Sequence, residues 1–278
     1  MRYRMEFSET TAAVRDYYNS NNIKNFHVFI YGENLHIGFY KNGNESIREA
    51  NLKTLDMISS LLTLNPSTLI LDIGSGEGGA ARYLAEKFCC RVDCLNLSEE
   101  QNERNRKFNQ ELGLDSLIRV IDGSFEAIPT PSNIYDRVWS QEALLFSSDR
   151  VQVFREVSRV LKNNGEFILT DVMQSDDCPL EVIKPALETV GIPSLASFKF
   201  YQELAKDIGF EEVQILEMPE QVTNQYQKTL EVMEQNYEEL AKSCDQDFLE
   251  YQRVRLNNWI KIGKQGYLNW GIIHFRKI

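Results

Sequence analysis

The sequence has few histidines, no long uncharged apolar run and no excess of positive charge. Its three histidines, His27, His36 and His274, have no spacing for a metal triad, and the five cysteines show neither metal spacing nor a paired framework. We therefore expect no metal, and reduced thiols in the cytoplasm. The net charge of −11 argues against a nucleic-acid partner. The missing apolar run argues against a membrane span, and we expect no signal peptide.

The rest of the composition is that of a soluble globular protein, with 42% hydrophobic and 26% charged residues. At 278 residues the chain can bury a full core, and it fits one domain with an insertion or a cap. A small molecule is the expected partner. The sequence leaves open whether the protein is a monomer or a homodimer.

An apolar run that ends in a glycine turn stands out at residues 69–79, Leu-Ile-Leu-Asp-Ile-Gly-Ser-Gly-Glu-Gly-Gly. Glycine has no Cβ and tolerates positive φ, so Gly74 and Gly76 allow the backbone to approach a flat ligand. Asp72 lies at the end of the run and faces the turn. A carboxylate there suits a cationic ligand such as the methionine ammonium of S-adenosylmethionine.

Two other interpretations of this turn stay open. Gly74, Gly76 and Gly79 also satisfy the dinucleotide fingerprint, which requires an acidic residue at the end of the second strand, about 20 residues further on. The expected second strand ends in Asn96, and Asp93 falls in its middle, so a dinucleotide is less favoured. The turn could also be a plain feature of an α/β protein that binds nothing.

Strands and helices alternate after Asn65-Pro66, which breaks the chain. Near-continuous apolar strands in such an alternation predict an α/β fold with a doubly wound, mostly parallel, seven-stranded Rossmann-like sheet. The expected strands cover residues 69–74, 91–96, 118–122, 136–140, 165–171, 210–217 and 270–275. The expected helices between them cover 79–87, 99–112 and 149–161. Ser98 would cap the second of these, with Gln101 as its capping-box partner.

This pattern predicts four parts: an N-terminal helical cover (1–64), an α/β core (65–218), a helical cap (219–265) and a final strand of the core sheet (266–278). In the cover we expect helices at 8–19 and 45–62, separated by an irregular aromatic segment at 20–44. The charged stretch 224–261 is expected to be helical and to lie on the sheet edge. A plain solvated hairpin is the alternative for that stretch.

The first motif, Asp72 to Gly76, resembles the D-x-G-x-G motif of the class I S-adenosylmethionine-dependent methyltransferases. More narrowly, the chain resembles the sarcosine/dimethylglycine N-methyltransferases of betaine synthesis. The segment Trp139-Ser140-Gln141-Glu142-Ala143 supports the superfamily. The blocks that carry the resemblance are 31–41, 71–84, 94–106, 122–129, 135–146, 154–171 and 266–271.

Ligands of open α/β sheets lie beyond the carboxyl ends of the strands, so the candidate residues are at those ends. Methyltransferases usually carry an acid after the second strand for the ribose hydroxyls. Here Asn96 with Gln101 could replace it, because amides both donate and accept hydrogen bonds. The expected cofactor-binding residues are Asp72, Gly74, Ser75, Gly76, Asn96, Leu97, Gln101, Gly123, Ser124, Phe125, Gln141, His36 and Gly38.

Each of these residues also has a purely structural interpretation. Asp72 could cap the following turn, and Gln101 could only complete its helix cap. Phe125, expected to wall the adenine beside Ser124, could be a core residue at a strand end. His36 belongs to a segment expected to fold over the cofactor, where Gly38 would permit close approach, but it could also be a packing residue.

The expected acceptor site is less well defined. A carboxylate such as Glu142 is costly in a closed cleft unless it pairs with a cation such as an ammonium, although it could instead cap the next turn. The resembling family usually has histidine at the position of Phe146, and Thr-Asp-Pro-Met where this chain has Thr-Asp-Val-Met. A zwitterionic acceptor also needs a cation, for which Lys184, Lys199, Arg253 and Arg255 are available. The expected substrate-binding residues are Glu142, Phe146, Met173, Tyr226 and Tyr31.

The leading hypothesis is an S-adenosylmethionine-dependent methyltransferase that methylates the nitrogen of sarcosine or dimethylglycine. The alternatives are a natural-product N-, O- or C-methyltransferase with a larger acceptor, a catalytically silent cofactor-binding module, and a dinucleotide-dependent oxidoreductase. An amine can lose its proton to water on binding, so no strong base is needed. We therefore assign no catalytic residue from the sequence.

Overall fold

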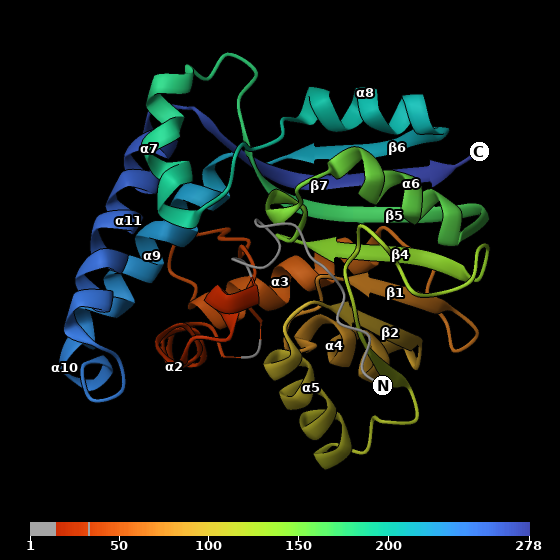
Figure 1. Ribbon diagram of the computed structural model, residues 1–278, viewed down its shortest axis with the longest axis horizontal. Coiled ribbons are helices and arrows are strands. Elements are labelled where there is room, and N and C mark those ends of the chain that lie inside the picture. Colours follow the sequence, from red (N-terminus) through yellow and green to blue (C-terminus); the bar gives the residue numbers. More distant parts are fainter. Residues whose placement is uncertain (1–14, 33) are drawn as a thin grey trace.

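The computed structural model describes residues 15–32 and 34–278. Its centre is a seven-stranded sheet with the order β3-β2-β1-β4-β5-β7-β6. Most of the helix expected at 8–19 lies outside the described residues, but residues 15–18 are helical. Figure 1 shows the sheet on one side of the molecule, and a group of helices beyond the tips of the β1 and β4 arrows.

All seven expected strands are present, and the sheet is mostly parallel as predicted. β1, β2, β3, β4 and β5 pair in parallel, whereas β7 pairs antiparallel with both β5 and β6. Strand order reverses between β1 and β4, which is where open α/β sheets bind ligands. The strands are β1 (Leu69–Ile73), β2 (Arg91–Asn96), β3 (Ile118–Asp122), β4 (Tyr135–Gln141), β5 (Leu161–Gln174), β6 (Phe210–Glu217) and β7 (Leu268–Lys277).

Two apolar layers cover the two faces of the sheet. One contains Leu55, Ala81 and Leu84 from the helices α3 (Ile47–Ser60) and α4 (Gly79–Phe88). The other contains Phe154 and Tyr201 from the helices α6 (Arg150–Val160) and α8 (Phe198–Ile208), whose rings stack 5.7 Å apart. The remaining helices of the core are α5 (Glu99–Glu111), the short 3-10 helix η1 (Leu144–Phe146) and α7 (Leu180–Val190).

Local capping explains where several helices begin. Ser46 and Glu49 form a reciprocal capping box at the start of α3. The Ser98 hydroxyl accepts the Gln101 backbone N–H at the start of α5, as predicted. The predicted return bond from the Gln101 side chain is wrong, because that amide bonds to Asn96 instead. The Gln101 side chain therefore contacts the end of β2 and does not serve only to cap α5.

The cover and the cap differ from the sequence prediction in detail. Residues 20–44 are not wholly irregular, because α2 (Asn21–Ile30) buries Ile23, Phe26 and Ile30 along one face. The predicted 224–261 helix is three helices, α9 (Glu220–Gln235), α10 (Tyr237–Leu240) and α11 (Gln246–Lys264). The helices α7 and α8 were not expected.

The cap does not form a solvated hairpin. Val222 of α9 and Trp259 of α11 share an apolar cluster with Trp270 of β7, so the cap lies on the sheet as predicted. Phe26 of α2 packs in another cluster with Met233 of α9. The division into cover, core, cap and final strand stays a prediction.

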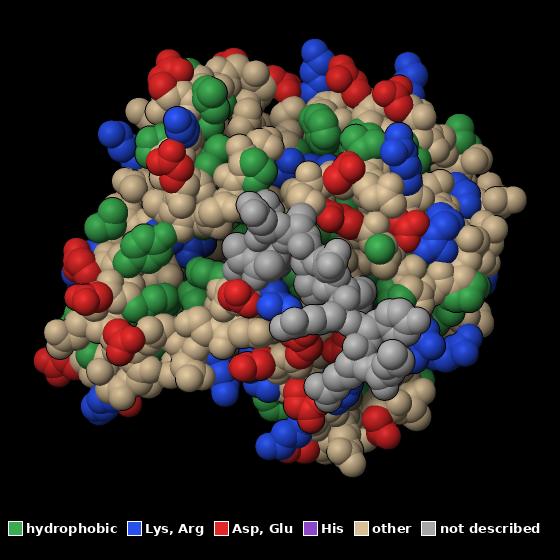
Figure 2. All heavy atoms as spheres, in the orientation of Figure 1, with side chains coloured by type: hydrophobic (Ala, Val, Ile, Leu, Met, Phe, Trp, Pro, Cys, Tyr) green, Lys and Arg blue, Asp and Glu red, His purple; other side chains and the backbone are tan. Residues whose placement is uncertain are grey.

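No helix in the described part of the chain is long and apolar enough to cross a membrane. The five cysteines are free thiols. Acidic and basic side chains are interspersed over the face seen in Figure 2, apart from the grey atoms.

Candidate functional site

A cavity lies beyond the carboxyl ends of β1, β2, β3 and β4, and α2 closes it from the opposite side. It therefore occupies the place where the topology predicts a ligand. The expected residues that line it are His36, Gly74, Ser75, Gly76, Asn96, Leu97, Gln101, Gly123, Ser124, Phe125, Gln141, Glu142 and Phe146.

The glycine turn forms one wall of this cavity. Gly74 has a φ of +76° and Gly76 a φ of +54°, which L side chains rarely adopt. A Cβ on Gly74 would come 2.3 Å from the Cβ of Ala143, whereas a Cβ on Gly76 would meet nothing within 4 Å. The backbone N–H groups of Gly74 and Ser75 both donate to the Leu95 carbonyl, at 2.8 and 3.2 Å. The open space beside Gly76 is thus the part of the turn that a ligand can approach.

Asp72 lies beneath the turn and does not line the cavity. Its side chain is buried, and its Oδ2 atom has no hydrogen-bond partner among the described residues. Burial raises the pKa of the Asp72 carboxyl to about 7, although the nearby His36 acts in the opposite direction. A cation brought next to Asp72 would favour its ionised form.

A pair of amides closes the end of β2. The Asn96 Nδ2 atom donates to the Gln101 Oε1 atom over 3.1 Å, and both residues are buried at the cavity wall. The Gln101 Nε2 and Asn96 Oδ1 atoms form no hydrogen bond within the described residues. The pair therefore offers one donor and one acceptor to a diol, which is the arrangement that the sequence suggested.

The ends of β3 and β4 supply the next part of the wall. Gly123, Ser124 and Phe125 follow β3, and the Ser124 Oγ atom accepts the Glu126 backbone N–H over 3.1 Å. Gln141 ends β4, where its Oε1 atom accepts the Trp139 indole N–H over 3.0 Å. Its Nε2 atom is buried and has no partner among the described residues. Phe125 also packs against the core, so its two interpretations are compatible.

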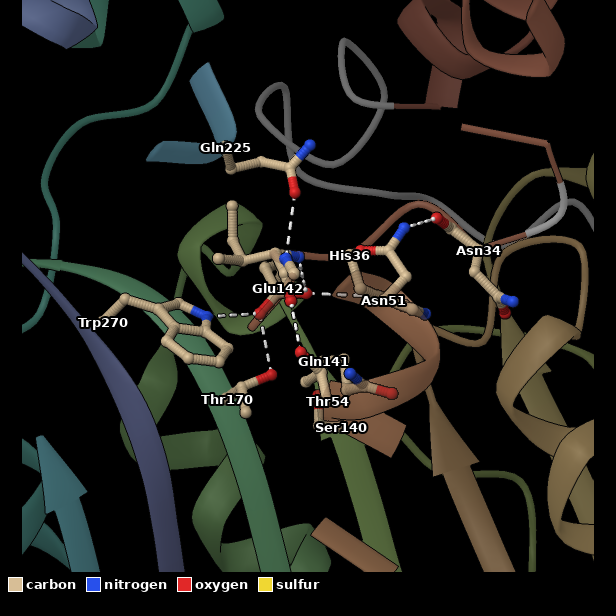
Figure 3. Close-up of polar contacts among 12 residues, drawn as sticks. Asn34, His36, Asn51, Thr54, Ser140, Gln141, Glu142, Thr170, Gln225 and Trp270 are labelled. Carbon is tan, nitrogen blue, oxygen red and sulfur yellow. Dashed lines mark hydrogen bonds and ion pairs between the residues drawn. The ribbon is translucent and has the colours of Figure 1, made fainter. Parts of the chain in front are cut away.

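Glu142 joins four segments of the molecule, as Figure 3 shows. Its Oε1 atom accepts the Thr170 hydroxyl and the Trp270 indole N–H, both at 2.7 Å. Its Oε2 atom accepts the Ile37 backbone N–H at 3.3 Å and lies 3.1 Å from the His36 Nδ1 atom. Both carboxylate oxygens are therefore fully used, in a residue with a φ of +46°. The alternative role of Glu142, a cap on the next turn, is not observed, because no side chain caps η1.

The segment that carries His36 is attached to the cap helix α9. The Gln225 Oε1 atom accepts the Gly38 N–H and the Tyr40 hydroxyl, each over 2.9 Å, and the Gln221 Oε1 atom accepts the Tyr40 N–H over 2.8 Å. Gly38 is not at the cavity. A Cβ there would come 2.4 Å from the Cβ of Ala50 on α3, so packing against that helix explains this glycine.

Of the other expected acceptor residues, only Phe146 lines the cavity. Met173, Tyr226 and Tyr31 are not among its lining residues. Met173 is fully buried in the core. The Tyr31 hydroxyl shares a 3.1 Å hydrogen bond with Thr229 of α9, and Tyr226 packs against Trp259 with ring centroids 6.0 Å apart.

Sequence reasoning missed the residues that α2 and the helical residues 15–18 contribute. Tyr18 and His27 line the cavity, and the Tyr18 ring lies 5.8 Å from that of Phe146 and 6.1 Å from that of His27. Burial and then Arg255 lower the pKa of His27 to about 3, so this imidazole is neutral at neutral pH. The spacing of Ile23, Phe26 and Ile30 was the signal that could have revealed α2.

The fold, the glycine turn and the cavity define a class I methyltransferase, and the comparisons with known proteins agree. A methyltransferase domain model matches residues 71–169. The chain is 44% identical to the sarcosine/dimethylglycine N-methyltransferase of Aphanothece halophytica, with 95% of this chain and 96% of the relative covered. The enzyme of the same name from Halorhodospira halochloris is 43% identical, with 95% of each chain covered.

Among solved structures, a protein from Galdieria sulphuraria that is provisionally assigned as a sarcosine dimethylglycine methyltransferase is 36% identical. It superimposes with a TM-score of 0.89 over 94% of this chain and 98% of that chain. This chain belongs to the sarcosine/dimethylglycine N-methyltransferase family. Its cofactor is S-adenosylmethionine.

The residues present fit this cofactor. Buried polar atoms with no partner among the described residues occur at Ser75 Oγ and Gln141 Nε2 on the cavity wall, and at Asp72 Oδ2 below it. Such atoms are costly unless a ligand pairs with them. The open space beside Gly76 and the Asn96–Gln101 amide pair after β2 are the other features of the cavity that fit the cofactor. No cluster of metal ligands occurs in the described ranges, 15–32 and 34–278.

Proposed function

We propose that this enzyme transfers methyl groups to the nitrogen of sarcosine and of dimethylglycine, with betaine as the final product. The observation that carries this proposal is the 44% identity over 95% of the chain to an enzyme named for these substrates. The aligned region is too long to be confined to the cofactor-binding core, because it covers 95% of the chain.

Individual cofactor contacts follow from the cavity wall. We assign the turn at Ser75 and Gly76 to the methionine part, and Asp72 to its ammonium, reached directly or through water. Asn96 and Gln101 would hold the ribose hydroxyls. The adenine would lie against Phe125, with Gly123, Ser124 and Leu97 beside it, and Gln141 would face the reacting end. Gly74 and Gly38 act through backbone packing.

The bound cofactor supplies an electrophilic methyl group on a sulfonium, and the protein supplies orientation and exclusion of water. The acceptor amine must present a free lone pair to that methyl group. Phe146, Tyr18 and His27 form an apolar side of the cavity that can receive the methyl groups already on the nitrogen.

No described residue at the cavity is placed to act as a strong base. His27 has a pKa of about 3, and the Glu142 carboxylate already accepts hydrogen bonds from other segments. Sarcosine would lose its proton to water before or during binding, and dimethylglycine needs only its neutral form. Glu142 is therefore a positioning residue, which holds His36 and the cover against β4, β5 and β7.

We also propose a cytoplasmic location, which the five free cysteines support. The expected partner is the small-molecule acceptor, and the choice between monomer and homodimer stays open.

The test is incubation with methyl-labelled cofactor and glycine, sarcosine or dimethylglycine, followed by identification of the products. We expect label in dimethylglycine from sarcosine, and in betaine from dimethylglycine. If no label enters any of the three while S-adenosylhomocysteine still raises the melting temperature, the acceptor assignment is wrong although the cofactor assignment holds.

A further inference from the structure

One basic residue, Arg255 of α11, differs from the other cations available to the acceptor. Lys184 lies within 4.0 Å of Glu188, and Lys199 within 4.0 Å of Glu203, each with about two thirds of its side chain exposed. Arg253 pairs with Glu234 and Glu250. Their charges are thus solvated or already matched.

Arg255 has no carboxylate within ion-pair distance among the described residues. Its Nη1 atom donates to two neutral acceptors, the Tyr17 hydroxyl over 3.0 Å and the Gln252 Oε1 atom over 3.1 Å. Its Nε atom is buried and has no partner. A partly buried cation with an unused N–H is costly, and a carboxylate that accepts from two guanidinium N–H groups would remove that cost.

The surroundings of Arg255 connect it to the cavity. Tyr17, Tyr226, Tyr31 and Tyr18 all lie close enough to interact electrostatically with its guanidinium. Of these, Tyr18 also lines the cavity and contacts Phe146 and His27. The Tyr17 hydroxyl accepts from Arg255, and the Tyr17 ring lies 5.2 Å from that of Tyr18, so Arg255 lies behind the apolar side of the cavity and does not itself line it.

The interactions within this cluster are consistent with a permanently charged guanidinium. Burial opposes the charge on Arg255, but the surrounding tyrosine hydroxyls outweigh it, and the pKa of Arg255 is raised. Burial, and secondarily the charge of Arg255, keep His27 neutral. Arg15, Lys24 and Arg104 also line the cavity. Arg15 pairs with Asp16 and Arg104 with Glu77, whereas the groups that surround Arg255 are tyrosines.

We propose that Arg255 binds the carboxylate of the amino-acid acceptor, with Tyr17 and Gln252 holding its guanidinium until the acceptor arrives. The Nε–H and an Nη–H would then donate to the two carboxylate oxygens, and the amine would point toward Phe146 and the glycine turn. This inference rests on the proposed function and adds the residue that selects amino acids over simple amines.

The first experiment compares Arg255→Met with Arg255→Lys in the full chain, with dimethylglycine as the acceptor. For Arg255→Met we expect KM to rise about 10- to 100-fold, because a charge-assisted pair is lost. The affinity for S-adenosylhomocysteine should stay within twofold. Arg255→Lys keeps the charge but not the fork of donors, so it should recover part of the loss.

Arg253→Met is the matched control, because Arg253 lies on the same helix but pairs with exposed glutamates over the Tyr237 ring. Its KM should equal that of the unaltered enzyme. A KM for Arg255→Met within threefold of the unaltered value overturns the inference. An equal loss of S-adenosylhomocysteine and dimethylglycine binding also overturns it, because that result indicates a purely structural role.

If Arg255→Met does not fold, the test rests on Arg255→Lys alone. A KM increase of at least about fivefold, with unchanged S-adenosylhomocysteine affinity, supports the inference, and a smaller increase contradicts it.

The activity of the unaltered enzyme separates a failure of this inference from a failure of the proposed function. If it methylates neither sarcosine nor dimethylglycine, the proposed function is wrong. If it methylates them and the Arg255 variants behave normally, only the role of Arg255 is wrong.

Discussion

The two sides of the cavity are built in different ways. The cofactor side consists of the ends of β1 to β4 and the turns that follow them, and the Asn96–Gln101 pair spans only five residues. The acceptor side is formed by α2 and η1, with α9 and α11 packed behind them, and the Tyr17–Arg255 hydrogen bond spans 238 residues. One side is therefore fixed by local sequence, and the other by tertiary packing.

The two sides also differ chemically. The cofactor side offers backbone groups, amides and one buried carboxylate, which can hold a ligand rich in hydroxyl and amino groups. The acceptor side offers aromatic rings around Arg255. We propose that recognition on the first side depends on many moderate hydrogen bonds, whereas recognition on the second depends on one charge and on shape. The following variants test this difference, from the largest expected effect to the smallest.

Gly74→Val should abolish the function of the cofactor side. The new Cβ would collide with Ala143, and valine is strained at a φ of +76°. We expect S-adenosylhomocysteine affinity to fall more than about 100-fold, measured by calorimetry. Gly43→Val is the control, because Gly43 has the same φ of +76° with nothing within 4 Å of its Cβ position. Normal binding by Gly74→Val would show that this turn is not the cofactor site.

Glu142→Gln should weaken the connection between the two sides. An amide nitrogen would face the Ile37 N–H, so at least one donor of the network in Figure 3 would lose its partner. We expect the free energy of unfolding to fall by about 2 kcal/mol in urea titrations. The exposed pair of Glu231 with Lys228 provides the control, and Glu231→Gln should cost less than about 0.5 kcal/mol. Equal losses would contradict the assigned role of Glu142.

Because the Asp72 carboxyl titrates near neutral pH, we expect the affinity for the cofactor to depend on pH. Burial raises the pKa of Asp72 to about 7, so below pH 7 the carboxyl is mostly neutral and attracts an ammonium poorly. Cofactor affinity should therefore rise with pH up to about 7, changing about tenfold per unit below it, and then level off. Asp72→Asn should bind weakly and without this dependence. An unchanged pH profile in that variant would exclude Asp72 as the titrating group.

Gln101→Ala should have the smallest effect. It removes one donor at the ribose position and the 3.1 Å bond from Asn96, so we expect S-adenosylhomocysteine affinity to fall about fivefold. Gln110→Ala, at an exposed position on the same helix, is the control for helix propensity. If both variants bind S-adenosylhomocysteine with the same affinity, the role of Gln101 is limited to stabilising α5.

The same difference explains how far the sequence could predict the structure. Periodic apolar strands and glycine turns predicted the fold class, the seven strands and most of the residues that line the cavity at the strand ends, because each signal lies within about ten residues. The tertiary contacts of Gly38 and Glu142 could not be read from the sequence, because their neighbours, Ala50 and Trp270, come from distant segments. Tyr18, His27 and Arg255 were not assigned for the same reason.

The position of β7 has a consequence for the order of assembly. β6 pairs only with β7, and β7 follows the whole cap in the chain. During synthesis, β6 therefore has no strand to pair with until some fifty further residues have been made. These residues include all of α9, α10 and α11. Trp270 reaches Glu142 only at that late stage. The hydrogen bonds that join β5 and β6 to the rest of the sheet through β7 consequently depend on the last residues to be made.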